Sequence, residues 1–373
     1  MKQDNQGEVT EMNYEEKMII AYEAVVSKKM SFKEACTKFK IPDSTLRDRV
    51  KKGNPTKGRR GKNATLDQNE SEKLTNCIMM LMKQGYNYTI DELCTLSSQY
   101  VVSIGKRKHD KPVTKHWFYL LCENFPKLKE LRIKLTQMDR TQTRDLTRVS
   151  SFFSYLSSCV NKYDLSERPC SIYSLSSTEL SYSWPYAIRE VPSHEEAITL
   201  FICANGAGNV IPPWYVFPEG KSNLDINRLQ EDCKPGFGFL AEERLFPSEI
   251  FLKYLTTHFL RHTLPQDHKI LLVDGHDLYV SVEILEWAEQ NQITLIVLPA
   301  DEYKTIQPLQ VDCLSSFERL LTENCKASMS GSQLERSALC KAVSDAYQQA
   351  FTSEEIQRSF RMSKIFPIPT EMI

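Results

Sequence analysis

The sequence lacks the features that would place it in a membrane, in a secreted fold or around a zinc cluster. No run approaches the ~18 apolar residues of a membrane span, and the first ten residues carry no apolar signal-peptide core. Eleven cysteines are present, but no two form a Cys-x-x-Cys pair. Disulfides and zinc knuckles are therefore disfavoured, and we expect an intracellular protein with free, mostly buried thiols and no membrane contact.

Spacing typical of a metal site is nearly missing as well. The exception is the pair His258 and His262 in FLKYLTTHFLRH. Histidines four residues apart share a helix face and can bind a metal, but no carboxylate or thiol adjoins this pair in sequence. We interpret both as polar positions on an amphipathic helix.

The net charge of −1 conceals two halves of opposite sign. Residues 1–140 contain 27 Lys and Arg and 18 Asp and Glu, a net charge of +9. Residues 141–373 contain 20 Lys and Arg and 30 Asp and Glu, a net charge of −10. Such asymmetry indicates a basic front part that binds nucleic acid and an acidic body, although a solvated basic surface without a partner has the same composition.

Three short helices are predicted near the N-terminus. Apolar residues recur at helical spacing over residues 13–28, and Ser31 with Glu34 forms a capping box for the second helix. Asp43 can cap the third helix, about residues 43–52. This order is typical of a helix-turn-helix, whose last helix enters the major groove of DNA.

The predicted DNA-contacting residues of this first module are hydroxyl and basic side chains. Ser44 and Thr45 lie at the start of the recognition helix, where side chains reach base edges. The basic arm after the helix suits contacts with phosphates or the minor groove, and a plain linker or a nuclear localisation signal would have the same composition. The basic candidates are Arg47, Arg49, Lys51, Lys52, Lys57, Arg59, Arg60 and Lys62.

A second group of three helices is predicted before residue 140. Thr65 with Gln68, and Thr89 with Glu92, have capping-box spacing, and Thr114 can cap a last helix, about residues 114–123. We expect the aromatic residues of that helix to pack inward. The candidate DNA contacts of this module are Lys106, Arg107, Lys108, Lys115 and His116.

The C-terminal part changes to strand patterns. Residues 170–177 are a strand candidate, and two apolar runs within residues 198–218 flank an Asn-Gly turn, which indicates a hairpin. Residues 269–298 follow the order strand, helix, buried strand, which predicts a β-α-β unit with a parallel pair.

Several motifs resemble one family of transposases. SFKEACTKFKIPDSTLRDRVKKG resembles the pipsqueak-type helix-turn-helix of pogo and Tigger transposases, and WFYLLCENFP resembles the centromere-protein-B-type module that follows it. ANGAGNVIPPWYVFPEGK, ILLVDGH and LPADEYKTIQPLQV resemble the DDE endonuclease domain, an RNase H-like α/β fold. The resemblance implies two all-α helix-turn-helix modules at 1–62 and 63–140, a linker helix at 141–168 and a DDE-like domain at 169–373.

The resemblance also implies a damaged catalytic site. The family site needs three carboxylates that hold two divalent metal ions. The matching positions here are Ser176, Asp274 and Gln310, so only Asp274 keeps a carboxylate. Glu179 and Asp312 lie close in sequence, but ligand placement in a metal site is strict, and we do not expect both to compensate.

We therefore expect a nuclear, sequence-specific protein that binds double-stranded DNA, has lost its nuclease activity and its ancestral magnesium site, and needs no cofactor. The acidic body would contact a second copy or chromatin proteins. Two other hypotheses stay open from the sequence: an active metal-dependent DDE endonuclease, and a protein-interaction scaffold with vestigial DNA binding.

Overall fold

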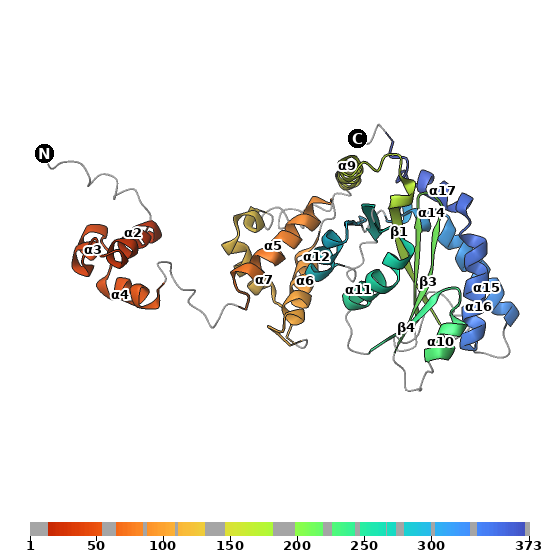
Figure 1. Cartoon of the computed structure of the whole chain (residues 1–373), viewed down its shortest axis with the longest axis horizontal. Coiled ribbons are helices and arrows are strands. Elements are labelled where there is room, and N and C mark those ends of the chain that lie inside the picture. The colour runs from red at the N-terminus through yellow and green to blue at the C-terminus, as the bar shows by residue number, and fades with distance from the viewer. Residues whose placement is uncertain are drawn as a thin grey trace. The chain divides into compact units, whose positions relative to one another are not determined.

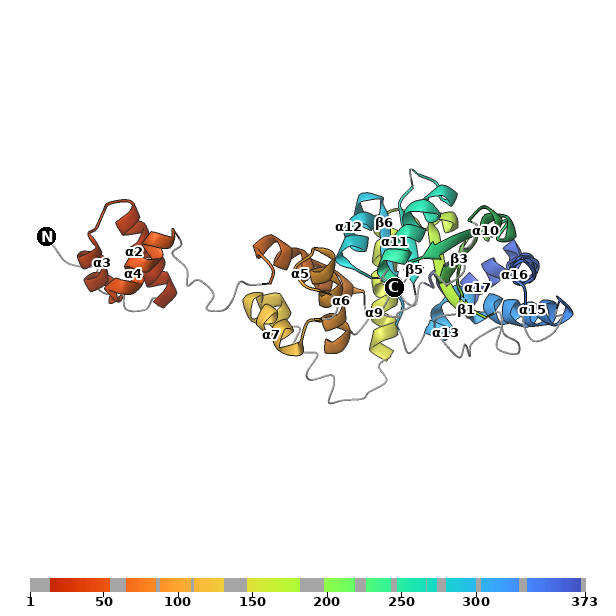
Figure 2. The same ribbon diagram turned by 90° about the horizontal axis from the view of Figure 1, so that it is seen from below.

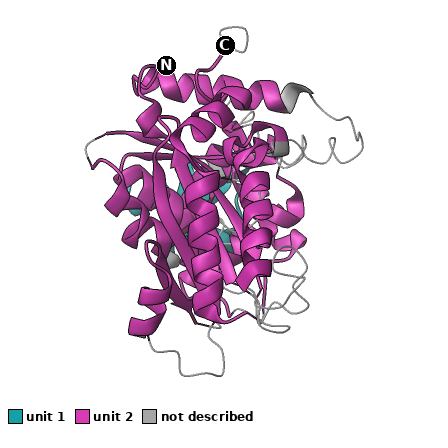
Figure 3. Cartoon of the chain, turned by 90° about the vertical axis from the view of Figure 1, so that its right-hand side faces the viewer, with its two compact units in different colours: residues 1–67 teal, residues 68–373 magenta. Residues whose placement is uncertain are grey.

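The computed structural model divides the chain into two compact units, Met1–Asp67 and Gln68–Ile373 (Figure 3). The predicted boundaries inside the second unit stay predictions. Within the described residues, no helix is long and apolar enough to cross a membrane. The structure describes residues 14–53, 65–84, 88–108, 111–130, 146–181, 198–218, 226–242, 247–265, 267–273, 280–299, 303–328 and 334–369.

The first unit is a three-helix module, as predicted (Figure 1). The capping box between Ser31 and Glu34 is confirmed: the Ser31 amide donates to Glu34 Oε2 at 2.9 Å, and the Glu34 amide donates to Ser31 Oγ at 3.3 Å. These bonds satisfy amides that the first turn of a helix leaves without partners. The three helices are α2 (Tyr14–Val26), α3 (Phe32–Phe39) and α4 (Asp43–Lys52), and their core consists of Met18, Ala21, Ala35, Phe39, Ile41 and Leu46.

The start of α4 differs from the prediction. Asp43 is the first residue of the helix and not its cap; the capping position belongs to Pro42, whose side chain has no oxygen to accept a hydrogen bond. The Asp43 carboxylate instead accepts a hydrogen bond of 2.6 Å from Arg47 Nε, one turn along the helix. At the other end Gly53 adopts a φ of +66°, a left-handed conformation that glycine takes without strain.

The second unit opens with three more helices. The predicted caps at Thr89 and Thr114 are confirmed. The predicted box between Thr65 and Gln68 is wrong, because the helix begins only at Gln68, whose side-chain amide donates to Glu72 Oε1 at 2.6 Å. The helices are α5 (Gln68–Lys83), α6 (Ile90–Ser103) and α7 (Lys115–Asn124).

A six-stranded mixed sheet follows, with the order β4-β3-β2-β1-β5-β6. The predicted hairpin is β2 with β3, and the predicted parallel pair is β5 with β6, joined by α12 (Val282–Gln290). β1 joins the two halves, antiparallel to β2 and parallel to β5, which is the RNase H-like arrangement expected from the resemblance. The strands are β1 (Ile172–Leu180), β2 (Ile198–Asn205), β3 (Val210–Pro218), β4 (Phe237–Ala241), β5 (Lys269–Val273) and β6 (Ile293–Val297).

Helices cover both faces of the sheet. Figures 1 and 2 place α11 and α12 on one side and α15 with α16 on the other. The remaining helices of the second unit are α9 (Leu146–Lys162), η1 (Pro169–Ser171), α10 (Ile226–Asp232), α11 (Pro247–Thr257), η3 (Phe259–His262), α13 (Tyr303–Ile306), α14 (Pro308–Val311), α15 (Cys313–Ser328), α16 (Arg336–Ala350) and α17 (Ser353–Met362).

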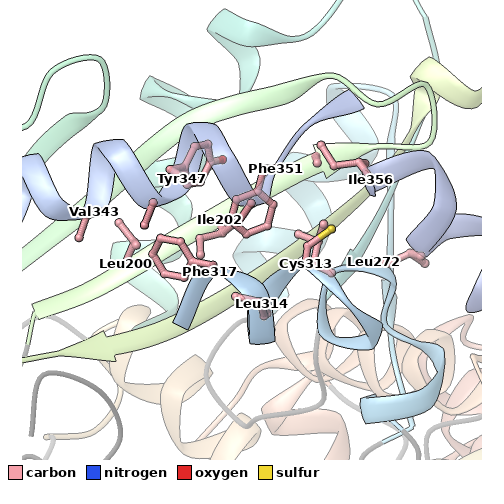
Figure 4. Packing of buried hydrophobic residues seen from close by; sticks show 14 of the residues in the cluster. Leu200, Ile202, Leu272, Cys313, Leu314, Phe317, Val343, Tyr347, Phe351 and Ile356 are labelled. Atoms are coloured by element: carbon pink, nitrogen blue, oxygen red, sulfur yellow. The ribbon is translucent and has the colours of Figure 1, made fainter. Parts of the chain in front are cut away.

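The main core lies between the sheet and α15 and α16. Leu200 and Ile202 of β2 face an aromatic group from the helices (Figure 4). The ring of Phe317 lies 5.7 Å from that of Phe351, and Tyr347 packs edge-on against Phe317. All eleven cysteines are free and most are buried, as the composition predicted. This core includes residues of β1, the inner strand that carries Ser176, one of the predicted catalytic positions.

Candidate nucleic-acid interface and nuclease site

The start of α4 is open to solvent. Ser44 and Lys51 are exposed and Thr45 is half-buried, whereas Leu46 is buried against α2 and α3. The helix therefore directs its polar N-terminal side chains outward and its apolar residues into the module. This is the geometry that a recognition helix needs in order to reach base edges.

The two arginines of α4 lie in different surroundings. Arg47 is exposed; it bonds to Asp43 and lies over the ring of Phe32, 4.6 Å from the centroid. Hydrogen bonding to Asp43 raises the pKa of Arg47, so its charge is secure. Arg49 is only 6% exposed and shares the face of Leu46, three residues earlier. In this structure Arg49 is placed for packing within the module and not for contact with base edges.

The basic arm lies mostly outside the described residues. Lys52 ends α4, but the position of its side chain is not described, and Lys57, Arg59, Arg60 and Lys62 fall in the range that the structure leaves out. Their roles remain predictions from the sequence.

The basic residues of the second module are partly engaged by neighbours. Lys106 Nζ lies 3.1 Å from Glu70 Oε1, and Arg107 donates to the Pro112 carbonyl at 3.0 Å. Lys115 Nζ lies 2.8 Å from Asp91 Oδ1, and this hydrogen-bonded carboxylate raises the pKa of Lys115. Lys108 and His116 are exposed. DNA would have to compete with Glu70 and Asp91 for two of the five predicted contacts.

Two predicted catalytic positions meet at the C-terminal part of β1. Ser176 is buried on β1, and Gln310 lies on α14. Gln310 Nε2 donates to Ser176 Oγ over 3.3 Å. Three residues earlier, Gln307 Nε2 donates to the Leu175 carbonyl at 2.7 Å and so fixes α14 against the strand. The two positions therefore face each other as the resemblance implied, but they form a neutral hydrogen bond.

The third position lies at the end of the neighbouring strand. β5 ends at Val273, and Asp274, the next residue, is outside the described residues. The parallel register pairs Ser174 with Leu272, which precede Ser176 and Asp274 by two residues each. The described register ends at that pair, so the grouping of Asp274 with Ser176 and Gln310 stays a prediction.

Neither nearby carboxylate replaces a missing ligand in this geometry. Glu179 is three residues from Ser176 on the same strand, so its side chain lies on the opposite face of the sheet, and it is exposed. Asp312 accepts a hydrogen bond from Arg358 Nε at 3.1 Å, and the guanidinium neutralises its charge. Hard divalent cations require negatively charged oxygen ligands, so the described residues here do not fit a magnesium pair.

The two histidines do not lie on one amphipathic helix, which corrects the sequence interpretation. α11 ends at Thr257, and His258 is a buried residue between that helix and η3. His258 Nε2 is 2.7 Å from the Pro212 carbonyl, and burial lowers its pKa to about 4. His262 Nδ1 is 2.9 Å from the His258 carbonyl. Both rings thus have structural partners on the backbone.

Comparison with known families agrees with this arrangement. Residues 14–59 match the family described as helix-turn-helix, Psq domain, and residues 195–360 match the DDE superfamily endonuclease. The chain thus combines a helix-turn-helix region with an endonuclease-superfamily domain, and the two matches support a transposase-derived protein.

More distant similarities add little detail. The "MFS-type transporter clz9" of Cochliobolus lunatus is 26% identical over 195 residues, 51% of this chain, and the chain spans only 21% of that protein. Structures of the Mos1 strand transfer complex and of a pre-cleavage Mos1 transpososome are each 12% identical, with TM-scores of 0.35 and 0.36. Those alignments cover 97% and 95% of this chain and 96% of each Mos1 chain. Because both TM-scores are low, the fold assignment depends on the strand order and the family matches.

Proposed function

We propose that the protein is a nuclear, sequence-specific DNA-binding protein descended from a pogo-like transposase, with an inactive nuclease site. The exposed N-terminal end of α4 in a Psq-type module carries the DNA-binding part of this proposal. Ser44 and Thr45 would contact base edges, and Arg47, Lys51 and the basic arm would contact phosphates. The positive charge of residues 1–140 would supply the long-range attraction.

Two modules in one chain favour a long binding site. A second module linked to the first gains affinity through a raised effective concentration, even when its own contacts are weak. The exposed Lys108 and His116 would supply contacts there. The acidic residues 141–373 would repel DNA. This part of the chain would therefore remain free to bind a second copy or a chromatin protein.

Selection from random duplexes with the full chain tests the DNA-binding proposal. We expect an enriched consensus, and for that duplex a logarithmic salt slope of about −0.9 per phosphate contact. Thr45→Ala should weaken discrimination between bases, whereas Lys51→Ala should weaken binding to all sequences. Lys253→Ala, on the exposed surface of α11, is the matched control and should change neither. Equal affinity for all duplexes would contradict sequence-specific binding.

The neutral contact between Ser176 and Gln310 supports the proposal of an inactive site. A nicking assay on the selected duplex with Mg²⁺ or Mn²⁺ should give no more product than the metal-free reaction. Asp274→Ala serves as the control for contaminating nucleases, because any nicking that persists in that variant does not come from this site. Metal-dependent nicking that Asp274→Ala removes would contradict the proposal.

A further inference from the structure

One glutamine joins the second helical module to the edge of the sheet. Gln84 follows α5 directly and is only 1% exposed. Its Nε2 donates to the Leu295 carbonyl at 2.7 Å, and its Oε1 accepts from the Val297 amide at 3.0 Å. Both backbone groups belong to β6, the last strand at that edge. In sequence the partners are more than 200 residues apart.

This pair of bonds imitates a strand. In a parallel sheet, a residue donates its N–H to one carbonyl of the neighbouring strand and accepts from an N–H two residues further along that strand. The primary amide of Gln84 makes the same two bonds with Leu295 and Val297. The side chain therefore takes the place of one residue of a seventh strand. It satisfies a backbone carbonyl and a backbone amide of β6 that would otherwise be free to pair with another chain.

Further contacts surround this attachment. Lys73 Nζ of α5 lies 2.9 Å from Glu286 Oε1 of α12 at the surface, and Cys77 of α5 is buried. The surface ion pair contributes little on its own, so the buried amide is the main polar contact of the attachment, beside the buried apolar residues of α5.

We propose that Gln84 is a positioning residue that clamps α5, α6 and α7 to the sheet, so that the second module moves together with the α/β domain. The Psq-type module, in contrast, belongs to a separate compact unit. DNA held by α5–α7 is then presented to the α/β domain in one fixed direction. Only this last consequence depends on the proposed DNA binding; the clamp itself does not.

Hydrogen exchange on the full chain without DNA tests the clamp. Gln84→Met keeps a similar length and removes both bonds. We expect the Val297 amide to exchange about tenfold faster, which is equivalent to the loss of one net hydrogen bond. The amides of α5 should accelerate by the same factor, because α5 separates from the sheet when these bonds are lost. Faster exchange at Val297 with unchanged exchange in α5 would overturn the proposal.

The opposite edge of the sheet offers a matched control. Gln230 of α10 donates from Nε2 to the Gly238 carbonyl of β4 and accepts from the Gly238 amide at 3.2 Å. Gln230→Met therefore removes two side-chain hydrogen bonds to the edge strand β4 without changing any contact of α5. We expect faster exchange at Gly238 and no change at Val297 or in α5. Acceleration of α5 in this control would mean that general loosening explains the result, and the clamp would be refuted.

A second readout covers the case in which Gln84→Met folds poorly. A carbodiimide couples the adjacent Lys73 amine and Glu286 carboxylate as an amide, which mass spectrometry detects. We expect this cross-link in the native full chain and a several-fold lower yield in the neutral variant Gln84→Asn, whose side chain is one methylene shorter and cannot hold both bonds to β6. No cross-link in the native chain, or an equal yield in Gln84→Asn, would refute the clamp.

Discussion

Under the proposed loss of the nuclease site, aspartates in place of Ser176 and Gln310 should restore metal binding. The variant Ser176→Asp with Gln310→Asp places carboxylates at positions whose side chains now meet over 3.3 Å. Ser176 is 1% exposed, so an unpaired charge there loses its hydration, at a cost of several kcal/mol. Without metal, burial and mutual repulsion should raise the pKa of the new pair. The unfolding free energy of the variant should then fall as the pH rises through that pair's range, because the folded state holds more protons than the unfolded one.

A divalent cation should reverse this loss. If the concentration of Mn²⁺ reaches a hundred times the dissociation constant, binding stabilises the folded state by about 2.7 kcal/mol. For the unit Gln68–Ile373, 1 kcal/mol corresponds to a rise of about 1.5 °C in melting temperature, so we expect a shift of about 4 °C. Thermal unfolding with Mn²⁺, Mg²⁺ or a chelator measures it. The natural sequence should show no shift.

Two controls make this test decisive. Asp274→Ala added to the restored variant should abolish the metal effect, because the third carboxylate is lost. Glu179→Gln added instead should leave it unchanged, because Glu179 lies on the other face of the sheet. The reasoning is wrong if the natural sequence gains as much stability from Mn²⁺ as the restored variant. It is equally wrong if the restored variant folds and gains none.

Three further predictions concern stability. Burial lowers the pKa of His258 from 6.5 to about 4, so the unfolded state binds more protons than the folded state between these pH values. About 3 kcal/mol of unfolding free energy is therefore lost as the pH falls through this window. The unfolding free energy of His258→Gln, measured by urea titration, should depend less on pH. Asp232→Ala leaves the mostly buried Arg336 without its ion-pair partner at 2.8 Å and should lower the unfolding free energy by about 3 kcal/mol. An unchanged urea midpoint would contradict a stabilising ion pair. Phe317→Ala should cost about 3–5 kcal/mol in the same assay, and a loss below about 1 kcal/mol would mean that the core of Figure 4 repacks.

The features predicted from the sequence were those that local patterns determine. The box at Ser31 and Glu34 and the Asn-Gly hairpin depend on residues a few positions apart, and both were found. β4 was not predicted, because FGFLA is short and its glycine weakens a strand pattern. The burial of Arg49 was visible in principle, since it follows Leu46 by three residues and so shares the buried face of α4.

Long-range contacts lay beyond such patterns. Gln84 stands in a polar turn after α5, and nothing near it in sequence indicates a partner on β6. The contact of Gln310 with Ser176 was implied only by the family resemblance, which supplied the positions but not their present chemistry. The sequence also does not reveal that Asp312 pairs with Arg358, 46 residues further along the chain, which places a cation beside this carboxylate.

The proposed replacement of two carboxylates by Ser176 and Gln310 would have a consequence for folding as well as for catalysis. Three carboxylates that converge beneath α14 would repel one another whenever no cation is bound, and this repulsion would push the helix from β1. With a hydroxyl and an amide, the same two positions attract each other, and Gln307 adds a hydrogen bond to the Leu175 carbonyl. Under the proposed loss of the nuclease site, the α/β domain would then need no metal ion for stability at these positions. Such a domain would suit a permanent binding body for a second copy or a chromatin protein, as proposed above.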